Sequence, residues 1–309
     1  FAGAPLATAQ AAETVEGPRV HWNFALWGKP RASNTAISNF AEWLPERTGG
    51  KFTMTIHWGT LSKPRAVLDG LALGAFQGGA FCASYYPAKL PAHTGLDLPF
   101  LPINNFKALQ GVTEDYYNHK ILKKETKKWN SFFHMSSLLP LYEVVGKGDV
   151  PKSLADWKGM RIRALGQQGK AMEALGAVPT TMPAPDVYTS MDRGLIDAAG
   201  FAYYAHESYR TYERGNWFTD GLDVGSIACG SLYNTDAFNG LPKQYQALFQ
   251  EFKADDKGYP AQIAAYTRTE EELPGHFEKS GLTRIKVTTE EREAFKKIGG
   301  QPVWDGWVK

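Results

Sequence analysis

Two periods of hydrophobic and polar residues alternate along the first part of the chain, and they predict strands that alternate with helices. The strand-like stretches are "RVHWNFAL", "KFTMTIHWG" and "GGAFCASYY". The helical stretches between them are "SNTAISNFAEWLPERTGG", which begins near Ser33, and "KPRAVLDGLALG", which ends at Gly74. This βαβαβ order predicts a parallel sheet with helices on its faces, so the fold belongs to the α/β class.

The same alternation returns later in the chain, after a proline-rich loop. The helix "FKALQGVTEDYYNHKILKKETKKW" and the strand "NSFFHMSSLL" come first, and "MRIRAL", "QGKAMEALG", "PAPDVYTSMDRG" and "LIDAAGFAYY" then predict strand, helix, helix and strand. No unit of fixed length repeats along the sequence. The pattern therefore predicts two α/β units of similar build.

The last third of the chain begins with a long apolar strand, "DVGSIACGSLYN", and continues into a long helical region. One buried helix face is predicted by the i, i+3, i+4, i+7 spacing of Tyr245, Leu248, Phe249 and Phe252. Gly258 and Pro260 should kink or break the region, because proline cannot donate to the carbonyl four residues before it. A strand, "LTRIKVT", and a final helix, "TEEREAFKKIGG", complete the pattern.

Composition places the chain among ordinary globular proteins, with 43% hydrophobic residues and a formal net charge of +2. So small a charge predicts no nucleic-acid partner. No apolar run approaches the length of a membrane span, so we expect no direct membrane insertion. "AQA" at Ala9–Ala11, in an alanine-rich N-terminal segment, fits the rule for cleavage of a secretory signal. We therefore expect an exported, periplasmic protein whose signal has been removed.

Two cysteines, Cys82 and Cys229, each lie in an apolar, strand-like segment. An oxidising compartment would permit a disulfide between them. Two buried free thiols are the alternative, because the sequence does not show whether the two Cα atoms lie close enough for a bond.

A search for catalytic signatures finds no nucleophile elbow, phosphate-binding loop, dinucleotide fingerprint or zinc-protease motif. His206 and Glu207 are neighbours in the sequence, but acid–base catalysis requires a convergent geometry that this spacing does not support. The acidic, histidine and cysteine residues show no spacing typical of a metal site. The sequence therefore favours a binding protein over an enzyme, with no catalytic residue, cofactor or metal.

Two arginines in "MRIRAL" are unexpected, because alternation places Arg161 and Arg163 on one face of a strand. The planar fork of an arginine suits a carboxylate bound beyond the strand ends of an open α/β sheet, and an ion pair across the sheet is the alternative. Aromatic residues also gather near predicted strand ends: Trp27, Tyr85, Tyr86, Tyr142, Phe201, Tyr203 and Tyr204.

The stretch "SLADWKGMRIRALG" and the residues after it resemble the extracytoplasmic solute-binding proteins of TRAP transporters, the DctP-type family. The family's pattern of a glycine, a basic-Ile-Arg strand, an LGA-x-P turn, a VY helix and a GLID strand start is matched by Gly159, Arg161–Arg163, Leu175–Pro179, Val187–Tyr188 and Gly194–Asp197. "LDLPFLP" and "YNTDAFNGLP" also fit. The resemblance covers nearly the whole chain beyond residue 18, and the order and spacing of its pieces carry it.

The resemblance implies a two-lobed, periplasmic-binding-protein-like clamp. Each lobe is a mixed, mostly parallel sheet flanked by helices, and a long C-terminal helical region spans the lobes. Residues 1–17 would be a flexible signal or linker remnant, residues 18–139 plus 228–255 the first lobe, and residues 140–227 plus 256–309 the second. The cleft would bind an organic acid and deliver it to a TRAP-type membrane permease.

The resemblance also assigns roles to the two arginines. Arg163, the last residue of the basic-Ile-Arg motif, would bind the ligand carboxylate, and Arg161 would be structural. Relatives with a metal beside the ligand place an acid where this chain has Gly200, so metal ligands are missing. Where relatives have Arg or Gln, this chain has Tyr142, which removes one contact to an anion.

Aromatic side chains would form the remaining walls of the cleft. Phe201 and Tyr142 would line the second lobe, and Trp27, Tyr85 and Tyr204 would add further aromatic surface, with core packing as the alternative for these rings. We therefore predict a ligand with one carboxylate and an apolar or aromatic body. The alternatives are a C4-dicarboxylate or a hydroxy or sugar acid, a cleft enzyme that acts on a small carboxylate, and a partner of a periplasmic sensor.

Overall fold

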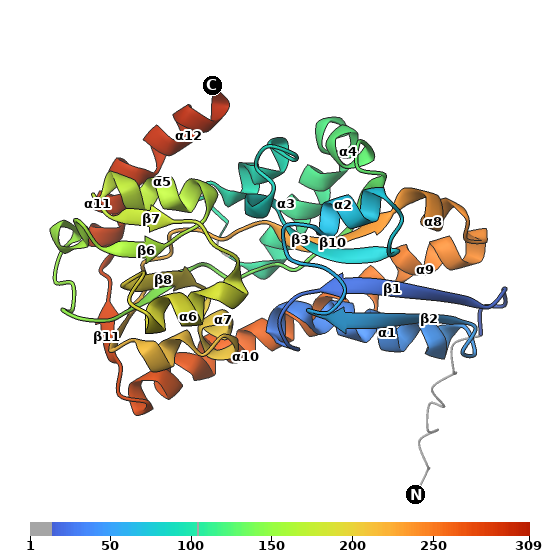
Figure 1. The fold of residues 1–309 in the computed structure, drawn as a ribbon, viewed down its shortest axis with the longest axis horizontal. Helices are drawn as coiled ribbons and strands as arrows, with labels where there is room; N and C mark the ends of the chain where they lie inside the picture. The colour runs from blue at the N-terminus through green and yellow to red at the C-terminus, as the bar shows by residue number, and fades with distance from the viewer. Residues whose placement is uncertain (1–13, 104) are drawn as a thin grey trace, which may run out of the picture.

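The computed structural model describes residues 14–103 and 105–309 (Figure 1). The predicted cleavage motif at Ala9–Ala11 lies outside the described residues. Val15 and Glu16, which belong to the segment predicted as a signal or linker remnant, both form hydrogen bonds. The Val15 N–H donates to the carbonyl of Arg47 (2.7 Å), and the Gln244 side chain donates to the carbonyl of Glu16 (2.9 Å).

The first sheet has the strand order β2-β1-β3-β10-β4. Its strands are β1 (Val20–Leu26), β2 (Phe52–Trp58), β3 (Gly78–Cys82), β4 (Ser131–Ser136) and β10 (Cys229–Asn234). All strands share one direction except β10, which is antiparallel to both β3 and β4. The helices around this sheet are α1 (Thr35–Arg47), α2 (Val67–Ala72), α3 (Phe106–Asn118), α4 (Lys120–Lys127), α8 (Thr235–Asn239) and α9 (Lys243–Ala254) (Figure 1).

The second sheet has the strand order β11-β9-β5-β8-β6-β7. Its strands are β5 (Glu143–Gly146), β6 (Arg161–Arg163), β7 (Val178–Thr180), β8 (Ala198–Phe201), β9 (Trp217–Asp220) and β11 (Thr283–Lys286). Only β5 runs against its neighbours. The helices of this part are α5 (Gly166–Ala174), α6 (Val187–Asp192), α7 (Tyr203–Ser208) and α11 (Thr289–Gly299), and α12 (Gln301–Val308) ends the chain.

Helix α10 (Tyr259–Lys279) runs along both halves of the molecule (Figure 1). It contacts α1 beside the first sheet and α7 beside the second, which confirms the predicted long helical region that spans the lobes. The chain also passes between the sheets at residues 137–142 and 221–228. Two mixed sheets joined in this way confirm the predicted clamp, whereas the lobe boundaries at single residues stay a prediction. Short 3₁₀ helices fill the connections: η1 (Ala32–Asn34), η2 (Ala83–Tyr85), η3 (Ala92–Asp97), η4 (Leu154–Trp157), η5 (Ala184–Asp186) and η6 (Thr211–Arg214).

Three predicted elements differ from the structure. The helix expected from residue 106 is two helices, because His119 has extended backbone and its side chain caps the start of α4. The strand expected from Asp223 begins only at Cys229, because Asp223 (φ 47°) and Gly225 (φ 128°) have positive φ angles that an extended strand does not adopt. The helix "TEEREAFKKIGG" is not the last one, since α12 follows it.

The predicted break at Gly258 and Pro260 is confirmed. Helix α9 ends at Ala254 and α10 begins at Tyr259, with Pro260 in the first turn, where its missing N–H leaves no hydrogen bond unmade. The predicted face of α9 is buried as a unit, with Tyr245 and Phe252 fully inaccessible. This packing places α9 against the first sheet.

Candidate ligand-binding site

A cavity with about 460 Å³ of free space, part of it open to solvent, lies between the two sheets. All six residues predicted to bind the ligand line it: Trp27, Tyr85, Tyr142, Arg163, Phe201 and Tyr204. Tyr86 and Tyr203, the other two aromatic residues noted near strand ends, do not line it, and their hydroxyls donate to the carbonyls of Pro64 and Thr219. The structure therefore brings the predicted set together, while their contact with a ligand stays a prediction.

Strand direction explains why these side chains meet. Arg163 and Phe201 are the last residues of the parallel strands β6 and β8, and Trp27 directly follows β1. Because β5 is antiparallel to β8 and pairs Glu143 with Phe201, Tyr142 reaches the same edge from the start of its strand. Ligands of open α/β sheets bind outside the carboxyl ends of the strands, which is where this cavity lies.

Arg163 is the central charge of the cavity. The residue is 1% exposed. Its Nη1 donates to the carbonyl of Gly200 (2.8 Å) and its Nε to that of Met182 (3.4 Å), while Nη2 is buried with no hydrogen-bond partner in the described chain. A buried charge with an unused donor is costly unless an anion meets it. Nη2 is therefore available to donate one charge-assisted hydrogen bond to a carboxylate.

Arg161 has a different environment, although alternation places it on the same side of the strand. Its guanidinium is exposed and binds Asp197 with two nitrogens, Nε (2.9 Å) and Nη2 (2.5 Å). These hydrogen bonds lower the pKa of Asp197. The ion-pair alternative thus describes Arg161, which does not line the cavity.

Aromatic rings form much of the cavity wall. The guanidinium carbon of Arg163 lies 4.0 Å from the centre of the Phe201 ring, and Phe201 also contacts Tyr142 at a centroid distance of 6.2 Å. Burial raises the pKa of Tyr142 well above its usual value, so its hydroxyl stays a neutral donor. Trp27 packs edge-on against Tyr85 (5.7 Å). These rings belong to the buried core and also line the cavity, while their contact with a ligand stays a prediction.

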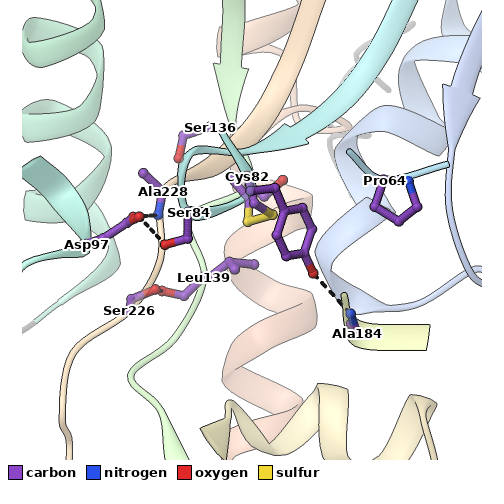
Figure 2. The surroundings of a disulfide bond; sticks show 12 residues. Pro64, Cys82, Ser84, Asp97, Ser136, Leu139, Ala184, Ser226 and Ala228 are labelled. Atoms are coloured by element: carbon purple, nitrogen blue, oxygen red, sulfur yellow. Dashed lines mark hydrogen bonds between the residues drawn. A yellow bond between two sulfur atoms is a disulfide. The ribbon is translucent and has the colours of Figure 1, made fainter. Parts of the chain in front are cut away.

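One hydrogen bond already joins the two halves across the cavity. The hydroxyl of Tyr85, which follows β3, accepts from the backbone N–H of Ala184, which opens η5 beside the second sheet (3.1 Å, Figure 2). This contact shows that the two walls approach to within direct bonding distance.

The sequence analysis missed several residues of the cavity, among them Arg31, Asn34 and Tyr209. Nη1 of Arg31 donates to the carbonyls of Trp27 and Lys29 (both 2.9 Å), and its guanidinium lies over the Tyr209 ring at 5.4 Å. The cavity therefore contains two cations where one was counted. The sequence offered one signal for Arg31, which lies four residues after Trp27 in the loop that leaves the same end of β1.

The two cysteines form a disulfide in the cavity wall. Cys82 and Cys229 are direct partners in the β3–β10 ladder, and their Cα atoms are 4.0 Å apart. Both residues line the cavity. The two cysteines are therefore disulfide-bonded (Figure 2). The alternative left open by the sequence, two buried free thiols, does not apply.

A buried carboxyl group supports both strands beside the disulfide. Asp97 accepts hydrogen bonds from the Ser84 hydroxyl and from the N–H of Ala228 (2.5 Å), the residues that flank the two cysteine strands (Figure 2). Burial raises the pKa of Asp97 to about 7. Asp97 therefore links the end of β3 to the start of β10.

His206 and Glu207 do not form an acid–base pair. The His206 ring is fully buried against Thr211 (2.7 Å) and the carbonyl of Glu143 (3.3 Å), and burial lowers its pKa to about 3. Glu207 is exposed. No group of three or more His, Cys, Asp or Glu residues in the described chain could hold a metal ion, and none of its helices is both long and apolar enough to cross a membrane.

A second hollow, of about 980 Å³, lies beside the segments that connect the sheets. Mostly apolar residues line it, six of them leucines, together with Glu270 of α10, whose pKa burial raises to about 8. It contains none of the arginines of the chain. The smaller cavity at the strand ends is therefore the better candidate for an organic anion.

Two mixed sheets joined by crossing segments, with an inward-facing arginine between them, form a two-lobed clamp. The model of one family, "Bacterial extracellular solute-binding protein, family 7" (DctP), matches residues 27–309. The chain belongs to this family, whose members are periplasmic or extracytoplasmic transport proteins that bind organic acids, and not enzymes.

Individual relatives differ in what they bind. The chain is 26% identical to a monocarboxylate 2-oxoacid-binding periplasmic protein of Nostoc over 253 residues, 75% of this chain and 65% of the relative. It shares the fold of a TRAP solute-binding protein from Desulfovibrio salexigens with bound orotic acid (TM-score 0.83, 18% identity, 93% and 92% coverage). A marine metagenome protein described as specific for aromatic acids, with bound 3-hydroxybenzoate, matches with a TM-score of 0.80 (21% identity, 94% and 92% coverage). Other matching structures hold a glucuronate or malate, so the fold does not select one acid.

Proposed function

We propose that this protein captures a monocarboxylate with an apolar or aromatic body in the interlobe cavity and delivers it to a TRAP-type membrane permease. The observation that carries the proposal is the buried Nη2 of Arg163, which has no partner in the described chain. A ligand carboxylate would supply the missing acceptor and offset the cost of burying the charge.

The preference for a single carboxylate rests on how the two cations are used. Arg31 already donates twice to backbone carbonyls and lies over Tyr209, whereas Arg163 keeps an unused buried donor. The other walls are mostly rings and small apolar groups. The remaining polar groups of the wall are four tyrosine hydroxyls, Ser33, Ser137 and Asn34. A polyhydroxy acid would leave hydroxyls unmet wherever its body faces the rings and small apolar groups, at about 1–3 kcal/mol for each unmet group.

Family membership supports delivery to a permease and a location in the periplasm. Closure of two lobes around a ligand offers a permease a surface that differs between empty and loaded protein. We therefore place this chain outside the cytoplasmic membrane, as the carrier that hands the acid to the membrane subunits.

A thermal-shift screen tests the ligand class. Purified protein is incubated with aliphatic and aromatic monocarboxylates, C4-dicarboxylates and sugar acids, and the tightest acid is then measured by calorimetry. We expect monocarboxylates to raise the melting temperature most, because a ligand stabilises the state that it binds. Stabilisation only by dicarboxylates or sugar acids would show that the proposed ligand class is wrong.

The anchor is tested with Arg163→Ala and Arg161→Ala as a matched pair from the same strand. We expect Arg163→Ala to abolish binding and Arg161→Ala, whose side chain is exposed and paired with Asp197, to leave the affinity unchanged. Tight binding by the Arg163→Ala variant would show that another group anchors the acid.

A further inference from the structure

Asn34 presents an unused hydrogen-bonding group to the cavity from the half of the molecule opposite Arg163. The residue is 3% exposed, lines the cavity, and its Oδ1 is buried without a partner in the described chain. Buried polar groups in native proteins are almost always hydrogen-bonded, so each exception requires an explanation.

The usual role of this side chain is taken by another residue. Asn34 is the N-cap of α1, where an asparagine normally accepts from a backbone N–H of the first helical turn, but its side chain makes no such bond. Instead, Oε1 of Gln262 on α10 accepts from the N–H of Ala36 (3.1 Å), and Nε2 of Gln262 donates to the carbonyl of Ala32 (2.6 Å). Gln262 is fully buried, and its side chain caps the start of α1 in place of the Asn34 side chain. The Asn34 amide is therefore free to face the cavity.

The charges of the cavity limit which donor could meet this oxygen. Arg31 and Arg163 line the cavity, and none of the described lining residues is acidic. An ammonium group beside two guanidinium groups and no carboxylate would be strongly disfavoured. A neutral hydroxyl meets the Asn34 oxygen without that repulsion.

We infer that Asn34 is a specificity-determining residue that accepts a hydrogen bond from a neutral hydroxyl on the bound acid. The inference deepens the proposed function and rests on it: Arg163 binds the carboxylate from one side, and Asn34 selects hydroxylated monocarboxylates from the other. The same arrangement excludes zwitterionic amino acids.

Matched ligands test the inference by calorimetry. The probes are benzoate, 3- and 4-hydroxybenzoate and 3- and 4-(aminomethyl)benzoate, together with hexanoate and 6-hydroxyhexanoate for an aliphatic body. We expect at least one hydroxylated acid to bind about 5- to 150-fold tighter than its parent, because the parent leaves the amide oxygen unpaired. The aminomethyl acids should bind more weakly than the parent.

The Asn34→Ala variant should lose this preference. It should bind the hydroxylated acid about 5- to 150-fold more weakly and bind the parent acid at least as well as the wild type, since alanine leaves no unpaired group. A purely structural defect would instead weaken both acids alike. Asn239→Ala, at the exposed end of α8, is the matched control and should keep the preference, and circular dichroism melting checks each fold.

The possible outcomes separate the two proposals. If the wild type binds none of these monocarboxylates, the proposed function is overturned and this inference with it. If parent and hydroxylated acids bind equally, or if Asn34→Ala weakens both by the same factor, Asn34 does not read a hydroxyl while the proposed function stands. Tighter binding of an aminomethyl acid would overturn the exclusion of amino acids.

Discussion

The guanidinium carbon of Arg163 lies 4.0 Å from the centre of the Phe201 ring, closer than any other arginine–ring contact found in the described chain. The ring covers one face of the planar cation, and the Gly200 carbonyl accepts from its Nη1. An aromatic face attracts a cation most strongly when water is excluded. Phe201 therefore helps to hold the charge that would otherwise have only backbone acceptors.

Replacing Phe201 by leucine should weaken both folding and ligand binding. Loss of the ring contact should remove about 1–2 kcal/mol from the free energy of unfolding and from that of binding. For binding, this corresponds to about a 5- to 30-fold loss of affinity for the tightest acid of the screen. Urea unfolding and calorimetry measure the two effects. Phe218→Leu is the control, because Phe218 is equally buried but does not line the cavity, so this variant should lose stability and keep its affinity. Unchanged affinity in Phe201→Leu would contradict the prediction.

Loss of the Cys82–Cys229 disulfide should destabilise the protein. The bond closes a segment of 147 residues, and cross-links of native loops usually contribute about 2–5 kcal/mol, in part by restricting the unfolded chain. Urea unfolding with and without a reductant measures the change. The Cys82→Ala, Cys229→Ala double variant should show the same loss and no further response to reductant. An unfolding free energy that does not change on reduction would contradict the prediction.

Asp97 should make stability depend on pH. Burial raises its folded-state pKa from 3.8 to about 7, so the folded protein binds more protons than the unfolded chain between these values. Its contribution to stability is fully present below pH 3.8 and is lost as the pH rises through 7. A pKa change of one corresponds to about 1.4 kcal/mol, so the free energy of unfolding should fall by a few kcal/mol over this pH range.

The Asp97→Asn variant isolates this contribution. An amide can still accept from Ala228 and bond to Ser84, but it does not ionise. The unfolding free energy of the variant relative to wild type should therefore rise between pH 4.5 and pH 8. Glu143 and Glu270, whose pKa values burial also raises, are the same in both proteins and cancel in the difference. Parallel pH profiles would mean that Asp97 does not titrate in this range.

Gly225 should not tolerate a side chain. Its φ is 128°, which L-residues rarely adopt, and a Cβ there would lie 3.3 Å from the carbonyl oxygen of Leu98. We expect Gly225→Ala to cost about 1–3 kcal/mol of stability. Because the Gly225 carbonyl accepts from the N–H of Tyr142 (2.8 Å), ligand affinity should fall as well. Gly275 lies within α10, where an added Cβ has open space. Gly275→Ala should therefore raise the free energy of unfolding, by up to about 1 kcal/mol. Equal effects of the two variants would rule out this account.

The order of elements and the convergence at the sheet edge could be predicted from the sequence, because both depend on local periodicity and strand direction. The six residues predicted for the site lie at or close to strand ends that face the cavity: Arg163 and Phe201 close their strands, and the other four lie just outside strand ends. The ranking of Arg163 over Arg161 needed the family motif, since alternation alone treats the two residues alike.

Other features depend on residues far apart in the sequence, and no local pattern could reveal them. The freedom of the Asn34 side chain exists only because Gln262, 226 residues from Ala36, binds the helix start. The disulfide depends on the register of β3 and β10, which brings Cys82 opposite Cys229. The end of the helix at His119 depends on a histidine side chain acting as a cap, which periodicity does not indicate.

The place of β10 in the first sheet determines the order in which the molecule can assemble. Strand β4 pairs only with β10, and β10 also forms one side of β3, so the sheet is incomplete until residues 229–234 have been made. By then the chain has already passed through most of the second sheet. The first sheet, and the interlobe cavity that it lines, therefore depend on a strand that comes late in the chain, after most of the second sheet.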